Sequence, residues 1–325
     1  MNIAMIEAAA DRASGHLRRT PLLTSPFLDE IAGRSVYVKP ECLQHTGSFK
    51  ARGAWSALSA MDPAQRAGGV MAYSSGNHAQ GVAWAARAHG VRAVILMPAD
   101  APALKRENTE ALGAEVVLYD RTREDREAKG QALAQSLGLT LVKPYDDAQV
   151  IAGQGTVGLE IAEQVAKAGI SRADVLVCCG GGGLTSGIAL ALADRASGLR
   201  VRPVEPHGFD DVARSLRGGA IVENPVMDGS ICDAIVTPRP GDLTFPILRK
   251  LCGPGLVVSD DDALYAMAQA FLRLKLVVEP GGAVALAAAL LHVDEIEGEA
   301  VIAVISGGNV DPAMFARALS ATSTG

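Results

Sequence analysis

One short stretch of the sequence combines a lysine with neighbours that leave it without a counter-charge. Lys50 lies within Ser48-Phe49-Lys50-Ala51-Arg52-Gly53, at the start of an alanine-rich helical pattern that runs to about Met61. Burial lowers the pKa of an ammonium group, and a neutral amine can condense with an aldehyde. Lys50 is therefore a candidate Schiff-base nucleophile. Taken alone, the stretch also fits a lysine on a helix surface.

Three small-residue turns, each after a predicted apolar strand, favour the chemical interpretation. They are Ser74-Ser75-Gly76-Asn77-His78, Cys179-Gly180-Gly181-Gly182-Gly183-Leu184 and Ser306-Gly307-Gly308-Asn309. Hydroxyl side chains and free N–H groups at a helix start suit a carboxylate, and four consecutive glycines let N–H groups converge on one anion. Doubly wound sheets bind ligands at the carboxyl ends of their strands. The three turns therefore predict one ligand site.

With these motifs in this order, the chain resembles the fold-type II pyridoxal-phosphate enzymes, in particular the branch of threonine/serine dehydratases, serine racemases and hydroxyaspartate ammonia-lyases. The resemblance extends from about Arg19-Thr20-Pro21-Leu22 to Asp311-Pro312. It implies that Lys50 holds pyridoxal 5′-phosphate covalently, that Phe49 backs the pyridine ring and that Asn77 bonds the 3-hydroxyl. The remaining cofactor contacts that it implies are Gly180, Gly181, Gly182, Gly183 and Leu184 on the phosphate, and Ser306 at the pyridine nitrogen.

The alternation of apolar runs with helical patterns predicts an α/β fold of two domains, each with a twisted, mainly parallel sheet flanked by helices. Residues 69–146 are expected to form a small domain, inserted within a large cofactor-binding domain of residues 1–68 and 147–325. Helices are expected at Ile3 to Arg18, at Pro102 to Leu112, from around Gly153 onward, and at Asp260 to Lys275.

Composition excludes several classes of function. The net charge of −6 argues against a nucleic-acid partner. The longest apolar runs, such as Ala283 to Leu291, are far shorter than a membrane span, and the early Glu7 does not fit a signal peptide. The five cysteines lack metal-ligand spacing and are interpreted as reduced thiols of a cytoplasmic protein. The resemblance suggests a homodimer, and we expect no appended regulatory domain after the final helix.

The expected reaction follows from the groups around the cofactor. The freed Lys50 amine is the natural base for the α-proton of a bound amino acid. Ser306 is a neutral hydroxyl that would not keep the pyridine nitrogen protonated, which favours elimination of a β-substituent over transamination. The products would be a 2-oxo acid and ammonia. Ser75 leaves two interpretations open: a second proton-exchanging group that permits racemisation, or a ligand of the substrate carboxylate only.

The turn Ser74-Ser75-Gly76-Asn77-His78 is expected to bind the substrate carboxylate, with His78 as a helix-start or packing residue and not a base. A distal carboxylate would need a basic partner, preferably an arginine. Comparison with the serine racemase pattern brings Arg126 and Arg239 to active-site positions. We therefore expect 3-hydroxyaspartate as the favoured substrate, with L-threonine or L-serine as the alternative. Arg126 also lies in a mixed-charge run that fits a solvated helix face.

Glu205-Pro206-His207-Gly208-Phe209-Asp210-Asp211 matches the family pattern for a divalent cation. The resemblance implies carboxylate ligands from Glu205 and Asp211 and a carbonyl ligand from Phe209, which suits magnesium, manganese or calcium. The alternative is an acidic loop that caps a helix. Two other functions remain open: β-replacement, as in cysteine synthases, and a cofactor-binding regulator without turnover.

Overall fold

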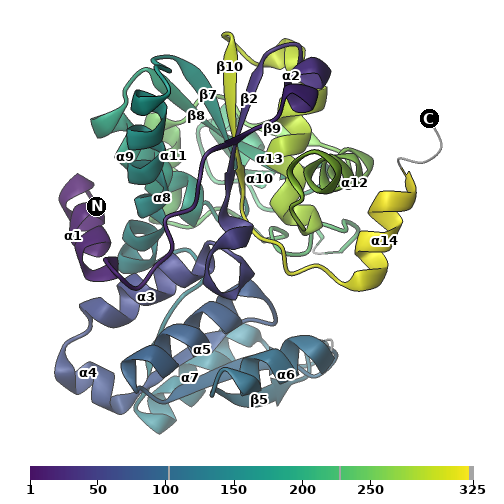
Figure 1. Cartoon of the computed structure of the whole chain (residues 1–325). Coiled ribbons are helices and arrows are strands. Elements are labelled where there is room, and N and C mark those ends of the chain that lie inside the picture. The colour runs from purple at the N-terminus through teal and green to yellow at the C-terminus, as the bar shows by residue number, and fades with distance from the viewer. Residues whose placement is uncertain (102, 227, 322–325) are drawn as a thin grey trace.

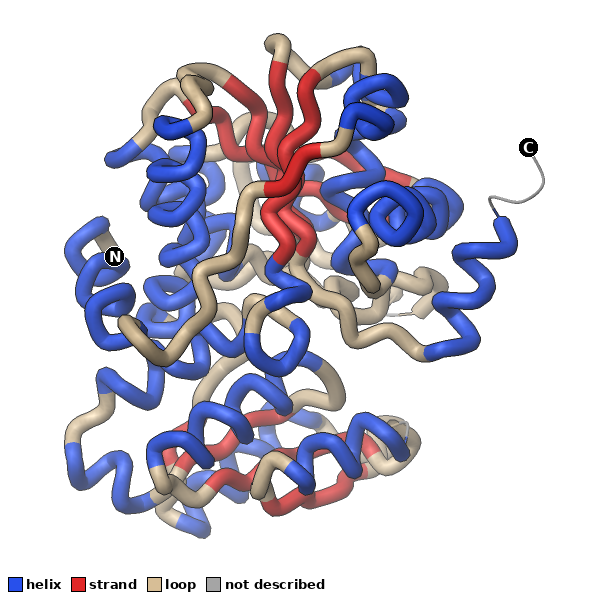
Figure 2. Tube along the Cα trace, viewed as in Figure 1, coloured by secondary structure: helices blue, strands red, loops and turns tan. Residues whose placement is uncertain are grey.

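The computed structural model describes residues 1–101, 103–226 and 228–321, and these residues form two separate β-sheets (Figure 2). In the larger sheet the strand order is β1-β2-β10-β7-β8-β9. Neighbouring strands are parallel except β1 and β2, which are antiparallel. The strands are β1 (Leu23–Thr24), β2 (Ser35–Pro40), β7 (Ala173–Cys178), β8 (Leu199–Pro206), β9 (Leu256–Val258) and β10 (Ala300–Ile305).

Helices cover both faces of the larger sheet (Figure 1). On one face lie α8 (Ala148–Lys167), α9 (Gly183–Arg195) and α11 (Thr244–Leu251), and on the other lie α12 (Asp260–Gln269) and α13 (Pro280–Leu291). All six residues of β7 are buried, as expected for a parallel strand covered on both sides. All residues of α13 except the last are also buried, which explains its nearly uniform apolar sequence.

The smaller sheet has the order β5-β4-β3-β6 and is entirely parallel. Alternate residues of its strands pack on opposite faces: Ala72 and Ile95 join one apolar cluster, and Met71 and Leu96 join another. The first cluster includes α5 and the second includes Ala134 of α7. The elements of this part of the chain are β3 (Val70–Tyr73), α5 (Asn77–His89), β4 (Ala93–Pro98), α6 (Ala103–Ala111), β5 (Glu115–Tyr119), α7 (Arg126–Leu137) and β6 (Thr140–Leu141).

Between the two sheets lies α3 (Lys50–Ala60), the helix that begins at Lys50 (Figure 1). It approaches α8 closely through Gly53 and Gly153: a Cβ at Gly153 would lie 2.4 Å from the Arg52 carbonyl oxygen. The remaining helices are α1 (Ile3–Ala13), α2 (Pro26–Ala32), α4 (Pro63–Gly68), α10 (Asp211–Gly218) and α14 (Pro312–Ala321), with the short turns η1 (Glu41–Leu43), η2 (His45–Gly47), η3 (Ala270–Leu274) and η4 (Val293–Glu295). No helix among the described residues is both long and apolar enough to cross a membrane.

The predicted α/β architecture with mainly parallel sheets is confirmed. The strands of the smaller sheet all lie between Val70 and Leu141, so we keep the boundaries at 68/69 and 146/147 as a proposal. The helix expected from Pro102 to Leu112 corresponds to α6, and Pro102 lies outside the described residues.

Three predicted helix boundaries were wrong. α1 ends at Ala13, shortly before Gly15 takes a φ of 76°. α8 begins at Ala148, before the glycines, because the Asp147 side chain accepts hydrogen bonds from the first free N–H groups of the helix. The long helix at Asp260 is α-helical only to Gln269 and continues as the π-helical turn η3.

A buried charge network fixes α3 relative to β2 and α8. Arg52 is 1% exposed, and its Nε lies 2.6 Å from Glu41 and its Nη1 2.7 Å from Glu160. Lys39, at 0% exposure, completes the network 2.6 Å from Glu160. Burying these groups without partners would be costly, so the network holds only while every carboxylate keeps its cation.

We expect Arg52→Met to lower the free energy of unfolding by about 3–5 kcal/mol, because it leaves Glu41 and Glu160 buried without a counter-charge. Chemical denaturation measures this. The matched control is Arg19→Met, which breaks the exposed Arg19–Glu163 ion pair and should cost about 0–1 kcal/mol. Equal losses in the two variants would contradict the role given to the network.

Candidate active site

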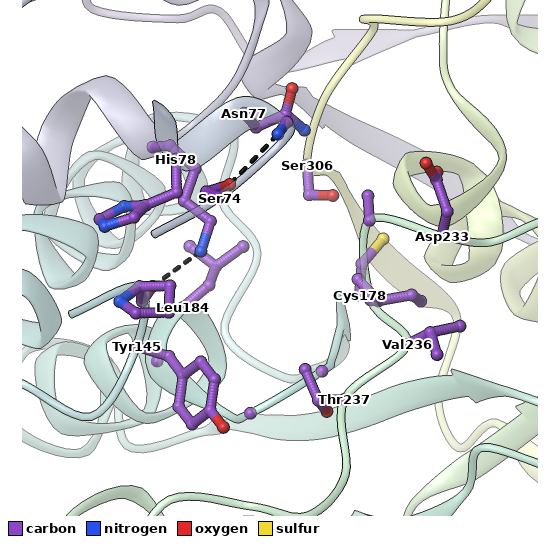
Figure 3. A pocket seen from close by; sticks show the side chains of 18 of the residues that line it. Ser74, Asn77, His78, Tyr145, Cys178, Leu184, Asp233, Val236, Thr237 and Ser306 are labelled. Carbon is purple, nitrogen blue, oxygen red and sulfur yellow. Dashed lines mark hydrogen bonds between the residues drawn. The ribbon is translucent and has the colours of Figure 1, made fainter. Parts of the chain in front are cut away.

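The three small-residue turns meet in one cavity of about 220 Å³ (Figure 3). Ser74 follows β3, Gly180 follows β7 and Ser306 follows β10, so each turn lies at the carboxyl end of a parallel strand. The cavity is lined by the sequence-predicted residues Phe49, Lys50, Ser74, Ser75, Gly76, Asn77, His78, Arg126, Gly180, Gly181, Gly182, Gly183, Leu184 and Ser306. It therefore joins segments from both sheets.

Lys50 reaches the cavity from the first turn of α3. Its Nζ donates a hydrogen bond of 2.7 Å to the Pro144 carbonyl and lies 5.1 Å from the centroid of the Phe49 ring. Burial lowers the pKa of the Lys50 amine to about 8, although the Glu279 carboxylate acts in the opposite direction. Roughly a tenth of the amine is therefore neutral at pH 7, far more than for an ordinary lysine, and a nucleophile or base needs this neutral form.

The lysine loop is tied to the end of β10. The Phe49 N–H donates to the Ser306 carbonyl at 3.1 Å, and Ser48 forms an isolated antiparallel bridge with Gly307. These backbone contacts fix the position of Lys50, the residue after Phe49, relative to Ser306. Ser306 itself is 3% exposed, and its side chain points into the cavity (Figure 3).

The turn after β3 presents hydroxyl and amide groups at the start of α5. Ser74 Oγ accepts the Gly76 N–H at 3.1 Å, which shapes the turn. His78 Nε2 lies 2.9 Å from the Val142 carbonyl, so Nε2 must carry the proton. Burial and the neighbouring Lys50 lower the pKa of His78 to about 3. An imidazole with so low a pKa is a very weak base, which supports the expectation that His78 does not act as one.

The four glycines form a close-fitting backbone cradle at the start of α9. A Cβ at Gly181 would lie 2.3 Å from ring carbons of Tyr145, and Gly182 has a left-handed φ of 90°. Thr244 Oγ1 donates to the Gly181 carbonyl at 2.7 Å and so fixes the turn. Thr185 Oγ1, inside the first turn of α9, is buried without a partner. A helix start with free N–H groups and an unpaired hydroxyl fits a phosphate.

Arg126 and Arg239 lie in different surroundings. Arg126, the first residue of α7, lines the cavity, with its guanidinium 5.2 Å from the centroid of the Tyr73 ring and 3.8 Å from Glu127. Arg239 lines an adjoining cavity and forms a double hydrogen bond to Asp242, at 2.8 and 3.2 Å. The structure thus brings Arg126 into the lysine cavity and leaves Arg239 beside it.

The expected cation ligands lie at the end of β8, away from the cavity. The two Glu205 oxygens accept the N–H groups of Val212 and Ala213 at 2.8 and 2.7 Å. Asp211 Oδ1 accepts from Asn224 at 2.6 Å, whereas Asp211 Oδ2 is buried without a partner. Burial, together with Asp211, raises the pKa of Glu205 well above its usual range, and burial raises the pKa of Asp211 to about 6.

The Glu205–Asp211 pair fits a cation better than an acidic helix cap alone. An unpaired buried carboxylate oxygen beside a second carboxylate is unfavourable until a positive charge joins them. Phe209 is 3% exposed on the same loop. Within the described ranges no group of three or more His, Cys, Asp or Glu side chains is placed to hold a metal, so a cation here would depend on carbonyl or water oxygens as well.

Sequence reasoning missed several residues that line the cavity. Glu279 immediately precedes α13 and resembles an ordinary acidic residue at a helix start. Tyr145 follows Pro144 and packs on the glycine cradle. Lys105 of α6 and Asp233 form an ion pair of 3.1 Å between the two parts of the chain, at the partly exposed rim of the cavity. None of these residues belongs to a local motif.

Comparisons with known proteins agree on one family. A family model described as "Pyridoxal-phosphate dependent enzyme" matches residues 13–307. L-threo-3-hydroxyaspartate ammonia-lyase of a Pseudomonas species is 44% identical over 96% of both chains, and the Saccharomyces cerevisiae protein of that name is 41% identical over 98% of this chain and 96% of its own. The solved structure of a threonine deaminase from T.th. superposes with a TM-score of 0.91 at 42% identity, covering 96% of this chain and 99% of that one.

We expect Gly181→Ala to weaken binding of pyridoxal phosphate by about tenfold or more, because the added methyl group would displace Tyr145 or the phosphate cradle. Titration of the apoprotein with the cofactor, followed by absorbance, measures the dissociation constant. Gly218→Ala is the matched control, since nothing lies within 4 Å of a Cβ at that position. An unchanged dissociation constant in Gly181→Ala would disprove the cradle assignment.

Proposed function

The chain belongs to the pyridoxal-phosphate-dependent enzymes, as its motifs led us to expect, and we propose that it is an ammonia-lyase whose favoured substrate is 3-hydroxyaspartate. The proposed products are oxaloacetate and ammonia. The observation that carries the choice of substrate is Arg126, a guanidinium in the same cavity as Lys50 whose nearest carboxylate is 3.8 Å away. The names of the two hydroxyaspartate ammonia-lyase relatives support the same choice.

Each part of the cavity has a place in this reaction. When bound, pyridoxal phosphate withdraws electrons from the α-carbon of an amino acid and so makes its α-proton removable. We assign the phosphate group to the N–H groups of Gly180 to Gly183 and to the unpaired Thr185 hydroxyl. Lys50 Nζ takes the α-proton, because its lowered pKa of about 8 leaves enough of the free amine.

The substrate is oriented by its two ends. We assign the α-carboxylate to the turn Ser74-Ser75-Gly76-Asn77-His78, where neutral His78 does not compete for protons. The distal carboxylate is assigned to Arg126. Arg239 would have to leave Asp242 to take part, so its contribution stays a prediction.

L-Threonine or L-serine deamination is the alternative, supported by the likeness to threonine deaminase. Serine racemases of several organisms are also relatives, for example at 39% identity in Schizosaccharomyces pombe. Ser75 lines the same cavity as Lys50, so racemisation as a side activity stays open. β-Replacement and a regulator without turnover are disfavoured by this set of relatives.

A divalent cation at Glu205 and Asp211 belongs to the proposal, with the Phe209 carbonyl as a third ligand. The five cysteines are all free thiols, which supports the expected cytoplasmic location. The homodimer expected from the resemblance stays a prediction.

If Arg126 binds the distal carboxylate, Arg126→Ala should weaken transition-state binding of 3-hydroxyaspartate by about 2–4 kcal/mol, seen as a lower kcat/KM. The kcat/KM values for threonine and serine should stay nearly unchanged. Release of 2-oxo acid and ammonia measures both. Arg123→Ala, in the same charged run but 84% exposed, is the matched control, and Arg239→Ala tests the adjoining cavity. Equal losses on threonine would refute this substrate assignment.

We expect magnesium, manganese or calcium to raise the melting temperature more at pH 8 than at pH 5. The pKa of Asp211 is raised to about 6, so without a cation the folded state gains stability on acidification, and this gain is lost as the pH rises through 6. A cation should therefore restore most stability above pH 6. Asp211→Asn should abolish the response and Asp210→Asn should keep it. A melting temperature that no divalent cation shifts would rule the site out.

A further inference from the structure

Glu279 is a buried carboxylate in the cavity wall that the proposed reaction does not use. It is 4% exposed and forms no salt bridge with any described residue. Its Oε1 accepts a hydrogen bond of 2.6 Å from Asn77 Nδ2. A buried carboxylate without a cation is costly to keep, so its position calls for a reason beyond packing.

Glu279 ends a chain of hydrogen bonds with a fixed direction. Asn309 Nδ2 donates to the Thr46 carbonyl at 2.7 Å, and a backbone carbonyl can only accept. The same nitrogen lies 2.7 Å from Asn77, so the Asn77 atom facing it must be Oδ1. Asn77 Nδ2 therefore faces Glu279. Both hydrogens of Asn309 Nδ2 are donated, one to Thr46 and one to Asn77. Asn77 Nδ2 donates one hydrogen to Glu279. Its second hydrogen is therefore the one side-chain amide hydrogen of this hydrogen-bond chain that is still available to a ligand.

The backbone is shaped around this arrangement at Gly307. A Cβ there would lie 2.0 Å from Glu279 Oε1 and 3.1 Å from Asn77 Nδ2. The Gly307 carbonyl also accepts the Glu279 N–H at 3.1 Å. Gly307 thus makes room for the Glu279–Asn77 contact, and a larger residue at this position would displace the Glu279 carboxylate.

We infer that Glu279 is a positioning residue: together with Asn309 it fixes the Asn77 amide so that Asn77 presents one N–H group, and not its oxygen, to the ring oxygen of the bound cofactor. An N–H donor favours the ionised form of that oxygen. Asn77 and Ser306 lie near each other in the cavity, away from Tyr145 and Thr237 (Figure 3). The inference rests on the proposed function only in placing the cofactor ring beside Asn77.

The charge of Glu279 should make this positioning depend on pH. Burial raises the pKa of Glu279 to about 7. The charged groups that act on it come from three other elements: Lys50 of α3, Lys105 of α6 and Asp233 of the loop before α11, and Glu279 also acts on the Cys42 thiol of η1. Above pH 7 the ionised carboxylate accepts a charge-assisted bond from Asn77, and acidification weakens that bond.

The test compares two variants of Glu279 by cofactor binding to the full chain. Glu279→Met removes the acceptor and leaves a buried Asn77 N–H unpaired, so the dissociation constant of pyridoxal phosphate should rise by about 10- to 100-fold. Glu279→Gln keeps an acceptor without charge. We divide its dissociation constant by that of the parent at each pH, because the titration of the cofactor itself affects both proteins equally. This ratio should be at least about three times as large at pH 8.5 as at pH 6. The absorbance spectrum of the bound cofactor should shift in the Met variant.

Asn309→Ala removes the other end of the chain of hydrogen bonds. The effects of Asn309→Ala and Glu279→Met on the dissociation constant of pyridoxal phosphate should be clearly non-additive in the double variant, because both substitutions act through Asn77. Glu163→Gln, an exposed carboxylate change, should alter none of these values. The inference is overturned if Glu279→Met binds the cofactor within twofold of the parent, if the Glu279→Gln ratio is independent of pH, or if the two variants are additive. Failure to turn over 3-hydroxyaspartate would instead count only against the proposed substrate.

Discussion

The structure depends on one contrast between two cations on the first turn of α3. Arg52 is paired with Glu41 and Glu160, whereas Lys50 forms no ion pair with a described residue and donates to the Pro144 carbonyl. Burial lowers the pKa of the Lys50 amine to about 8, whereas the Arg52 guanidinium, held by two carboxylates, keeps its charge. The arginine holds the helix in place through buried ion pairs, and the lysine two residues earlier is thereby kept in a fixed position without an ion pair of its own.

The cavity around the lysine is built from close backbone approach. Parallel strands of the two sheets end at it, and glycines let the turns that follow come near their neighbours. Tyr145 packs directly against the glycine cradle, so the end of the cavity that we assign to the phosphate is defined by backbone and one aromatic ring. At the other end, Asn77, Asn309 and Glu279 hold each other through side-chain amides and a carboxylate. The shape of the cavity is therefore fixed mainly by backbone groups at the glycine end and by side-chain hydrogen bonds at the Asn77 end.

The sequence was informative where chemistry and backbone geometry restrict residue types over a few positions. The convergence of Lys50 and the four glycines on one cavity could be predicted because few other residue types fit those motifs, and β3 and β10 could be predicted because they are short apolar runs. Glu279 could not, since its partner Asn77 is 202 residues away. The placement of Arg239 followed from comparison with the serine racemase pattern, which gave no warning that Asp242, three residues on, would bind the guanidinium. Likewise, the start of α8 was hidden because the cap at Asp147 lies ahead of the glycines that marked the motif.

The ion pair between Lys105 and Asp233 connects the two parts of the chain across the rim of the cavity. Both side chains are partly exposed, at 27% and 66%, and exposed pairs of this kind contribute less than about 1 kcal/mol. Thermal motion suffices to separate them, and dissolved ions screen them further. This link between the two parts of the chain is therefore weak, and its strength should depend on ionic strength more than that of the buried ion pairs does.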